Sequence, residues 1–259
     1  MDLLNLNITE TGVKKPAICI PLTGSSRQEL AEEIKNLQGK PFQLLEWRAD
    51  KMIAAMKGHS FRNVTRELLN TLGAIRADIG VPLLFTIRTA GEGGEADITA
   101  EDYFFINRMV ADSKMADLID IEVFIAEGTD LVSEFIRYAH AAEQMVVLSN
   151  HDFEKTPAVE EMVSKYDCMN ELEGDIIKLA VMPHDENDAA TLLEAAAITN
   201  EKYPEKPLIA ISMGDAGMST RICAGQFGSV ITFASGEKAS APGQIDAETL
   251  QEYLDKYYK

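Results

Sequence analysis

Eight short apolar runs alternate along the chain with longer amphipathic stretches. Each run is almost continuously apolar, which favours strands that are covered on both faces, as in a parallel sheet. We therefore predict strands at residues 17–22, 43–48, 82–88, 117–123, 145–149, 175–181, 207–213 and 229–233.

Residues that commonly cap helices stand where the amphipathic stretches begin. Ser26, with Glu29 three residues later, fits a capping box, and Gly39 would end that helix. The same reasoning predicts N-caps at Thr99 and at Thr156, which a proline follows.

The spacing of these elements predicts the fold class. The predicted strands start about 22 to 39 residues apart, which suits repeated βα units of ~30 residues. Eight units in 259 residues, without a linker or a break in composition, indicate one (β/α)8 TIM barrel domain over residues 1–259. Residues 1–16 precede the first strand and could cover one barrel end. A doubly wound open sheet is the alternative, but it usually needs fewer strands.

Charge and cysteine content exclude several classes of function. Lys and Arg total 24 against 42 Asp and Glu, a net charge of −18, which repels nucleic acids and anionic membranes. Three cysteines without CxxC spacing make neither a disulfide scaffold nor a zinc site. We find no signal peptide, and no apolar run of the ~18–20 residues that span a bilayer. We therefore expect a cytoplasmic protein.

Polar residues stand at the ends of nearly all the apolar runs, where a barrel of this kind places its active site. Lys178 interrupts the sixth run between Ile177 and Leu179. Burial disfavours a charged amine, and a neutral amine can attack a ketone to form an imine. The other interpretation is a lysine that extends to solvent or pairs with an acid.

His151 comes just after the fifth run, and imidazole can pass protons in both directions near neutral pH. It is a candidate general acid/base, or else a residue that satisfies the end of the strand. Arg88 begins a loop with three glycines that also contains Glu92. A solvated loop acid is the simpler interpretation of Glu92 taken alone.

Glu46 and Arg48 end the second run, and their spacing puts both on one face of that strand. Charges that face a barrel mouth need partners or a ligand. Substrate binding and an internal lattice of ion pairs are therefore both open. The same alternation aligns further polar side chains: Thr86 with Arg88, and Asp120 with Glu122.

Two segments near the C-terminus add candidates. Arg221 lies in a segment with several glycines after the seventh run. Ser240 and Gln244 lie in ASAPGQI, whose composition suits a mobile lid or an ordinary surface loop.

Taken together, these segments resemble the type I 3-dehydroquinate dehydratase family. One short motif would be weak, but eight in the right order are highly specific. They are LEWRAD (45–50), PLLFTIRTAGEGGE (82–95), IDIE (119–122), SNHDFEKTP (149–157), KLAVMP (178–183), SMG with the later Arg221, FGSVITF (227–233) and ASAPGQI (239–245).

The resemblance implies a (β/α)8 homodimer without metal or cofactor that converts 3-dehydroquinate, a small-molecule substrate, to 3-dehydroshikimate in the shikimate pathway. It makes Lys178 the imine-forming lysine, His151 the general acid/base and Glu92 the acid beside it. Arg221 would hold the substrate carboxylate. The positions that would bind substrate hydroxyl and carboxylate groups are Glu46, Arg48, Arg88, Ser240 and Gln244. Pro21 stands where family members can carry serine, so the resemblance leaves a hydroxyl contact from the first strand to the substrate open.

Two rival functions remain at this stage. Another lysine-imine barrel, such as an aldolase, shares the amine and the fold, but the sequence lacks a clear phosphate-binding segment after the last strands. A non-enzymatic acidic scaffold leaves the polar residues at so many strand ends unexplained.

Overall fold

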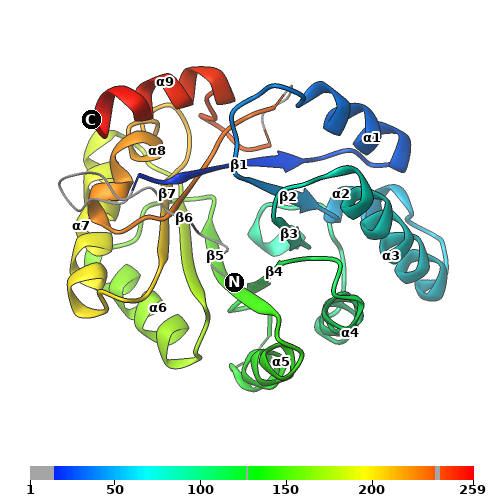
Figure 1. Cartoon of the computed structure of the whole chain (residues 1–259). Coiled ribbons are helices and arrows are strands. Elements are labelled where there is room, and N and C mark those ends of the chain that lie inside the picture. Colours follow the sequence, from blue (N-terminus) through cyan, green and yellow to red (C-terminus); the bar gives the residue numbers. More distant parts are fainter. Residues whose placement is uncertain (1–14, 127, 237–239) are drawn as a thin grey trace.

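The computed structural model describes residues 15–126, 128–236 and 240–259. In this part of the chain, eight parallel strands form one sheet in the order β7-β6-β5-β4-β3-β2-β1-β8 (Figure 1). A bridge between Leu208 and Ser229 closes the sheet into a barrel. The strands are β1 (Ala17–Leu22), β2 (Leu44–Arg48), β3 (Leu83–Thr86), β4 (Leu118–Glu122), β5 (Met145–Asp152), β6 (Ile176–Val181), β7 (Leu208–Ser212) and β8 (Ile231–Phe233).

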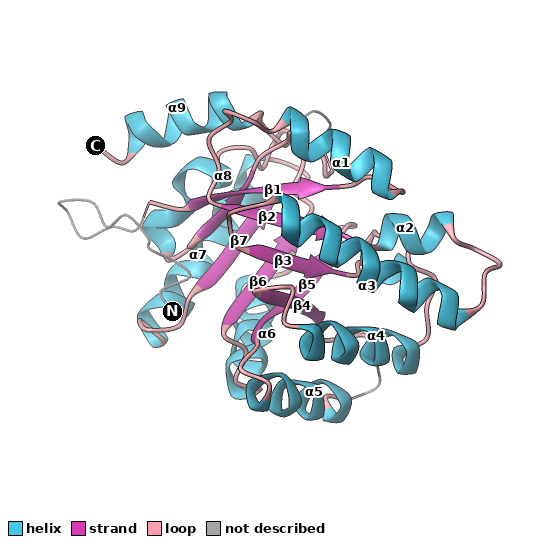
Figure 2. Ribbon diagram, turned by 45° about the vertical axis from the view of Figure 1, so that its right-hand side comes forward, coloured by secondary structure: helices cyan, strands magenta, loops and turns pink. Residues whose placement is uncertain are grey.

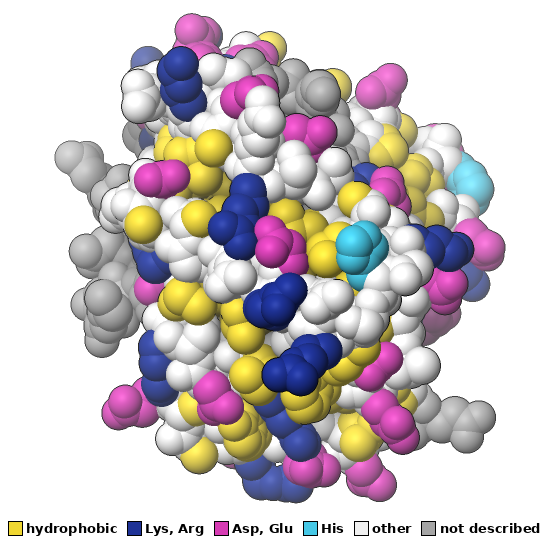
Figure 3. Space-filling view, turned by 90° about the vertical axis from the view of Figure 1, so that its right-hand side faces the viewer, with side chains coloured by type: hydrophobic (Ala, Val, Ile, Leu, Met, Phe, Trp, Pro, Cys, Tyr) yellow, Lys and Arg dark blue, Asp and Glu magenta, His cyan; other side chains and the backbone are white. Residues whose placement is uncertain are grey.

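Helices surround the strands (Figure 2). They are α1 (Arg27–Asn36), α2 (Asp50–Ala55), α3 (Phe61–Asp78), α4 (Ala100–Ser113), α5 (Asp130–Ala141), α6 (Val159–Glu171), α7 (Glu186–Lys202), α8 (Thr220–Cys223) and α9 (Ala247–Tyr257), with short 3-10 helices η1 (Ala90–Glu92) and η2 (Ala224–Phe227). No helix among the described residues has the length and apolarity needed to cross a bilayer. Acidic and basic side chains are interspersed on the face shown in Figure 3.

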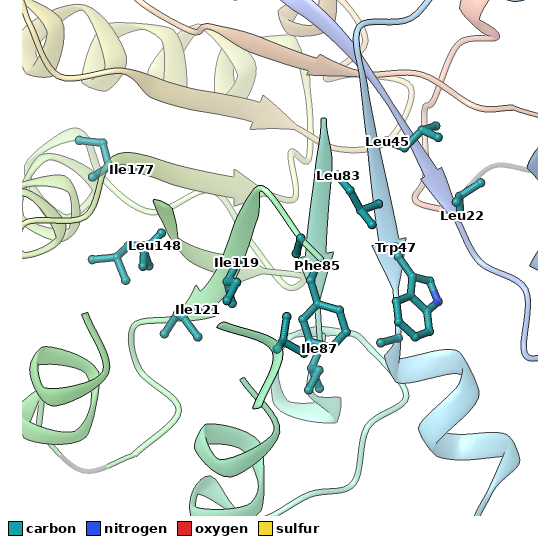
Figure 4. Packing of buried hydrophobic residues seen from close by; sticks show 14 of the residues in the cluster. Leu22, Leu45, Trp47, Leu83, Phe85, Ile87, Ile119, Ile121, Leu148 and Ile177 are labelled. Atoms are coloured by element: carbon teal, nitrogen blue, oxygen red, sulfur yellow. The ribbon is translucent and has the colours of Figure 1, made fainter. Parts of the chain in front are cut away.

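Alternation along each strand divides the apolar core into two layers. Outward side chains such as Trp47 and Phe85, whose ring centroids lie 5.5 Å apart, pack in the layer between strands and helices (Figure 4). Inward side chains such as Leu44, Leu118 and Ile176 form a second cluster inside the barrel. Since these inward residues are apolar near the start of each strand, the barrel is a packed core at that end.

On the inner face of the barrel, the residues two positions after these apolar residues are polar. Glu46 follows Leu44, and Lys178 follows Ile176, in the same inward register. The corresponding residues on the strands between them are Thr86, Asp120 and Ser149, all buried. The change from apolar to polar places a charged layer directly below the C-terminal ends of the strands.

The predicted (β/α)8 architecture is confirmed, and the closed parallel barrel excludes the open sheet. Ser26 and Thr99 are N-caps, each accepting a hydrogen bond from the backbone N–H three residues on. The prediction for Thr156 is wrong: α6 begins at Val159, and the Thr156 hydroxyl donates to the carbonyl of Met182. Of the predicted cover over residues 1–16, residues 1–14 lie outside the described residues.

The C-terminal ends of two strands differ from the prediction by more than one residue. β5 runs on to Asp152, because residues 147–152 pair with residues 176–181 of β6. His151 is therefore a strand residue and not a loop residue. β3 ends at Thr86, so that Arg88 lies just beyond its strand.

Candidate active site

A hollow of about 590 Å³, its open mouth included, lies at the C-terminal ends of the strands. Its walls include every candidate residue that the sequence suggested: Glu46, Arg48, Arg88, Glu92, His151, Lys178, Arg221, Ser240 and Gln244. Apolar side chains that the sequence did not single out, among them Phe153, Met213 and Phe233, complete the lining. Charged groups beside an apolar wall suit a small ligand that has both polar groups and an apolar part.

Lys178 points into the barrel and is 4% exposed. Its apolar neighbours in sequence, Ile177 and Leu179, belong to the outer layer and do not surround the amine. The Nζ atom instead lies 3.5 Å from Oδ2 of Asp120 and 4.0 Å from Oε1 of Glu46. The lysine that pairs with acids, one of the interpretations the sequence left open, is thus what the structure contains, because alternation sends the apolar neighbours to the opposite face.

The Lys178 ammonium also lies 4.7 Å from the centroid of the Phe233 ring, a cation–π distance. Two carboxylates and an aromatic face thus surround a nearly buried amine. Such surroundings can stabilise a positive charge on the nitrogen, whether as an ammonium or as an iminium.

His151 and Glu92 form a largely buried pair. Nδ1 of His151 lies 2.8 Å from Oε2 of Glu92, which also accepts the His151 backbone N–H at 2.9 Å. Asn150 donates from Nδ2 to the other oxygen at 2.9 Å. With Nδ1 held by Glu92, Nε2 is the ring atom left for a ligand.

Burial sets the protonation of this pair. It raises the pKa of Glu92 to about 8, against the opposing effect of Arg88. Burial, with the nearby cations Arg88, Lys178 and Arg48, holds the pKa of His151 well below its usual range. The imidazole is therefore neutral near pH 7, as a general base must be.

Arg88 lies at the centre of a buried ion-pair network. Its Nη1 donates to Glu122 at 2.8 Å and to Ser149 at 3.1 Å, and its Nη2 donates to Asp120 at 2.7 Å. Glu92 lies 3.4 Å from Nη1. The ion-pair lattice that the sequence left open is thus present around Arg88, whose charge is more than offset within the protein.

Arg221 contrasts with Arg88. It is 2% exposed and donates to the backbone carbonyls of Gly243, Phe233 and Pro242, at 2.8, 3.2 and 3.0 Å. Among the described residues no carboxylate pairs with it. Desolvation lowers its pKa to about 10, so it remains a cation at neutral pH. An unneutralised guanidinium in a pocket wall is a binding site for an anion.

The other binding candidates are fixed by local contacts. Arg48 donates through Nε and Nη2 to both oxygens of buried Asp50, at 2.8 and 2.9 Å. Gln244 donates to the Ser240 hydroxyl at 2.9 Å and accepts the Ser240 backbone N–H at 2.7 Å. The 240–244 segment therefore forms a turn whose carbonyls hold Arg221.

The structure also places Asp120, Ser149 and Asn150 around the reactive groups. Alternation along the strand aligned Asp120 with Glu122 but gave Asp120 no role in the site. The same period of two would have found Ser149, because it stands two residues after an inward apolar residue, as Lys178 does. No comparable pattern marks Asn150. Over the described residues, no group of three or more His, Cys, Asp or Glu is arranged to hold a metal ion.

Comparison with known proteins agrees with this geometry. The profile of the type I 3-dehydroquinase family matches residues 18–259. A 3-dehydroquinate dehydratase of Clostridium botulinum is 41% identical over 92% of this chain and 91% of its own. One of Bacillus licheniformis is 42% identical over 94% and 92%.

Solved structures agree as well. The type I 3-dehydroquinate dehydratase of Clostridium difficile, determined with covalently modified comenic acid, has a TM-score of 0.86 at 37% identity and covers 94% and 93% of the two chains. The 3-dehydroquinate dehydratase of Geobacillus kaustophilus has a TM-score of 0.85 at 29% identity and covers 99% and 98%. With its barrel, its buried amine and its near full-length match, this chain belongs to the type I 3-dehydroquinase family of hydro-lyases.

Proposed function

We propose that this enzyme removes water from 3-dehydroquinate to give 3-dehydroshikimate through an imine on Lys178. The observation that carries the proposal is a nearly buried lysine amine in the same pocket as a neutral histidine held by a carboxyl group. Family membership favours dehydration over the aldolase and scaffold alternatives.

The first stage joins the substrate to the enzyme. The Lys178 ammonium gives up one proton, its nitrogen attacks the ketone carbon, and the ketone oxygen takes up a proton to give a carbinolamine. A second proton passes from the nitrogen to this oxygen, which leaves as water, and a protonated imine remains. An ammonium and a ketone thus yield an iminium and one water. The positive nitrogen can accept electrons that a neutral ketone accepts poorly, which acidifies the adjacent carbon.

The second stage moves a proton and expels the hydroxyl group. Nε2 of His151 takes the proton from the carbon next to the imine, and the C–H electrons form an enamine. As the enamine collapses, the C–O bond on the following carbon breaks, and His151 returns its proton to the departing hydroxyl. Hydrolysis of the iminium then frees Lys178, so that the net change is loss of one water. Such proton transfer typically contributes ~10²–10⁴-fold.

The pocket also offers contacts to hold the substrate. Arg221 is the group proposed to bind the carboxylate, because its charge has no carboxylate partner among the described residues. The hydroxyl and remaining carboxylate contacts are assigned to Glu46, Arg48, Arg88, Ser240 and Gln244, all of which line the pocket. The mechanism requires neither a metal nor an organic cofactor.

Three measurements test the proposal together. Purified enzyme should convert 3-dehydroquinate to a conjugated, ultraviolet-absorbing product. Borohydride added with substrate should inactivate it and add the reduced substrate to the peptide that contains Lys178. Lys178→Met should abolish both effects, while Lys202→Met, which removes a surface lysine paired with Asp167, should retain both. Labelling at another lysine, or dehydration by the methionine variant, would overturn the mechanism.

The wider expectations remain proposals. We propose a single domain over residues 1–259, a homodimer and a cytoplasmic location. Light scattering on the purified protein tests the dimer, since a mass near 28.5 kDa, that of one chain, would refute it.

A further inference from the structure

Asp120 carries a carboxylate oxygen that receives no hydrogen bond from any described residue. The side chain is fully buried on the inner face of β4. Its Oδ1 accepts hydrogen bonds from Arg88 and Ser149, both at 2.7 Å. Its Oδ2 accepts none and lies 3.5 Å from Nζ of Lys178. A buried acceptor without a donor is rare enough to require a physical reason.

No other described anion lies as close to the reactive nitrogen. Glu46 is the next, at 4.0 Å, and the same oxygen of Glu46 already accepts the Thr86 hydroxyl at 2.9 Å. Water reaches this region poorly, since Lys178 is only 4% exposed. A positive charge on this nitrogen therefore depends mainly on Asp120 for its counter-charge.

The charged groups around Asp120 keep it ionised. Burial acts to raise its pKa, but Arg88, Lys178 and the Ser149 hydroxyl outweigh burial, and the pKa of Asp120 lies below its usual value. The titratable and charged groups of this cluster are Arg88 after β3, Lys178 on β6, Glu46 on β2, Glu122 on β4, Glu92 on η1, Tyr103 on α4, His151 on β5 and Cys19 on β1.

We propose that Asp120 is the counter-ion that keeps the imine nitrogen of Lys178 protonated, a role that rests on the proposed function. A lysine ammonium and the iminium formed from it carry the same single positive charge on the same atom. Asp120 can therefore neutralise both without gaining a proton, and its open Oδ2 can accept the N–H of the iminium. Asp120 does not line the pocket, so it is a positioning residue that acts through Lys178.

Protonation of the imine determines whether the next step can occur. A neutral imine has no positive nitrogen to accept the electrons that deprotonation releases. An opposite charge within ~4–6 Å typically changes a pKa by about 1–3 units in favour of the charged form. Asp120 should therefore extend the reaction to higher pH by about that amount.

The test compares two variants that each remove one negative charge next to Arg88. Asp120→Asn removes the charge that faces Lys178. Glu122→Gln removes a carboxylate that is bonded to Arg88 at 2.8 Å but makes no ion pair with Lys178. We expect the alkaline limb of kcat to move down by about 1–3 pH units in Asp120→Asn alone, with KM changed much less than kcat. No movement in that variant, or equal movement in both, would refute the counter-ion role.

A measurement on the unmodified enzyme covers the case in which Asp120→Asn does not fold. Cyanoborohydride reduces the protonated imine, so its reaction rate can be followed against pH for the enzyme imine and for the imine of the same substrate with n-butylamine. The enzyme imine should stay reducible to higher pH, and identical pH curves would contradict the proposal. Failure to label Lys178 at all would instead refute the proposed function, so the two failures are distinguishable.

Discussion

Arg221 and Arg88 are both buried arginines in one pocket wall, but different groups neutralise them. Arg88 is surrounded by Asp120, Glu122 and Glu92, whereas Arg221 contacts only backbone carbonyls among the described residues. Partial charges on carbonyl oxygens satisfy the N–H groups of Arg221 but do not cancel its charge. Two arginines of similar burial should therefore contribute differently: Arg88 to the organisation of the site, and Arg221 to attraction of the substrate anion.

Replacing Arg221 should weaken substrate binding selectively. We expect Arg221→Ala to raise KM about 10- to 100-fold, because a charge-assisted hydrogen bond contributes roughly 1.5–3 kcal/mol. Arg221→Lys keeps the charge but lacks the planar fork of hydrogen-bond donors. Its KM should therefore lie between those of the unmodified enzyme and the alanine variant. Steady-state kinetics give KM, and circular dichroism checks that each variant is folded. An unchanged KM in a folded alanine variant would remove Arg221 from substrate binding.

The coupled protons of His151 and Glu92 predict a pH dependence. His151 can accept a proton at Nε2 only when Nδ1–H donates to an ionised Glu92, so the pair must lose one proton. Because burial raises the pKa of Glu92 to about 8, kcat/KM should rise about tenfold per pH unit below that value and level off above it. In Glu92→Gln this rise should vanish from the region near pH 8. If Glu92→Gln kept the same pH profile of kcat/KM, a group other than Glu92 would be responsible for the rise.

At the scale of elements, apolar patterning predicted the barrel well because strands covered on both faces need continuous apolar runs. The end of β5 was missed since Asn150, His151 and Asp152 have the polarity of a loop, and only pairing with β6 makes them a strand. The sequence also could not show which groups pair with each charged side chain. Charges at the strand ends were evident, but whether Arg88 would pair with acids or remain open for a ligand depends on its distances to groups on β4 and β5.

The loop after β3 offers a test of how an element positions a catalytic group. A Cβ added to Gly94 would lie 2.1 Å from the carbonyl oxygen of Arg88, so Gly94→Ala must displace the loop that carries Glu92. A displacement near 1 Å can cost ~10²-fold in rate, and we expect a loss of kcat on that order. Gly91→Ala is the matched control, because its nearest neighbour is 3.6 Å away, in ordinary contact. Equal kcat values for the two variants would contradict this view of the loop.

At the scale of the whole molecule, closure of the barrel links the first strand to the last. β1 pairs with both β2 and β8, and the bridge from Leu208 of β7 to Ser229, just before β8, joins the two ends of the sheet. If the chain is a single domain, loss of one strand removes support from both of its neighbours.

Unfolding should therefore be cooperative. The only tryptophan, Trp47, is fully buried on β2, and its fluorescence reports that strand, while far-ultraviolet circular dichroism reports the surrounding helices. We expect the two signals to give the same midpoint in urea. Separate midpoints would indicate that part of the chain unfolds independently, against the single-domain proposal.

The net charge of −18 predicts how salt affects capture of the substrate. The substrate is a carboxylate, so the molecule as a whole repels it, while Arg221 attracts it only at short range. Raising the ionic strength from 0.01 to 0.15 M shortens the Debye length from ~30 to ~8 Å, which weakens the distant repulsion more than a buried contact. We expect kcat/KM to rise on the order of twofold and then level off, with kcat nearly unchanged. A fall in kcat/KM over this range would mean that the pocket cations, and not the net negative charge, determine the electrostatic potential outside the pocket mouth.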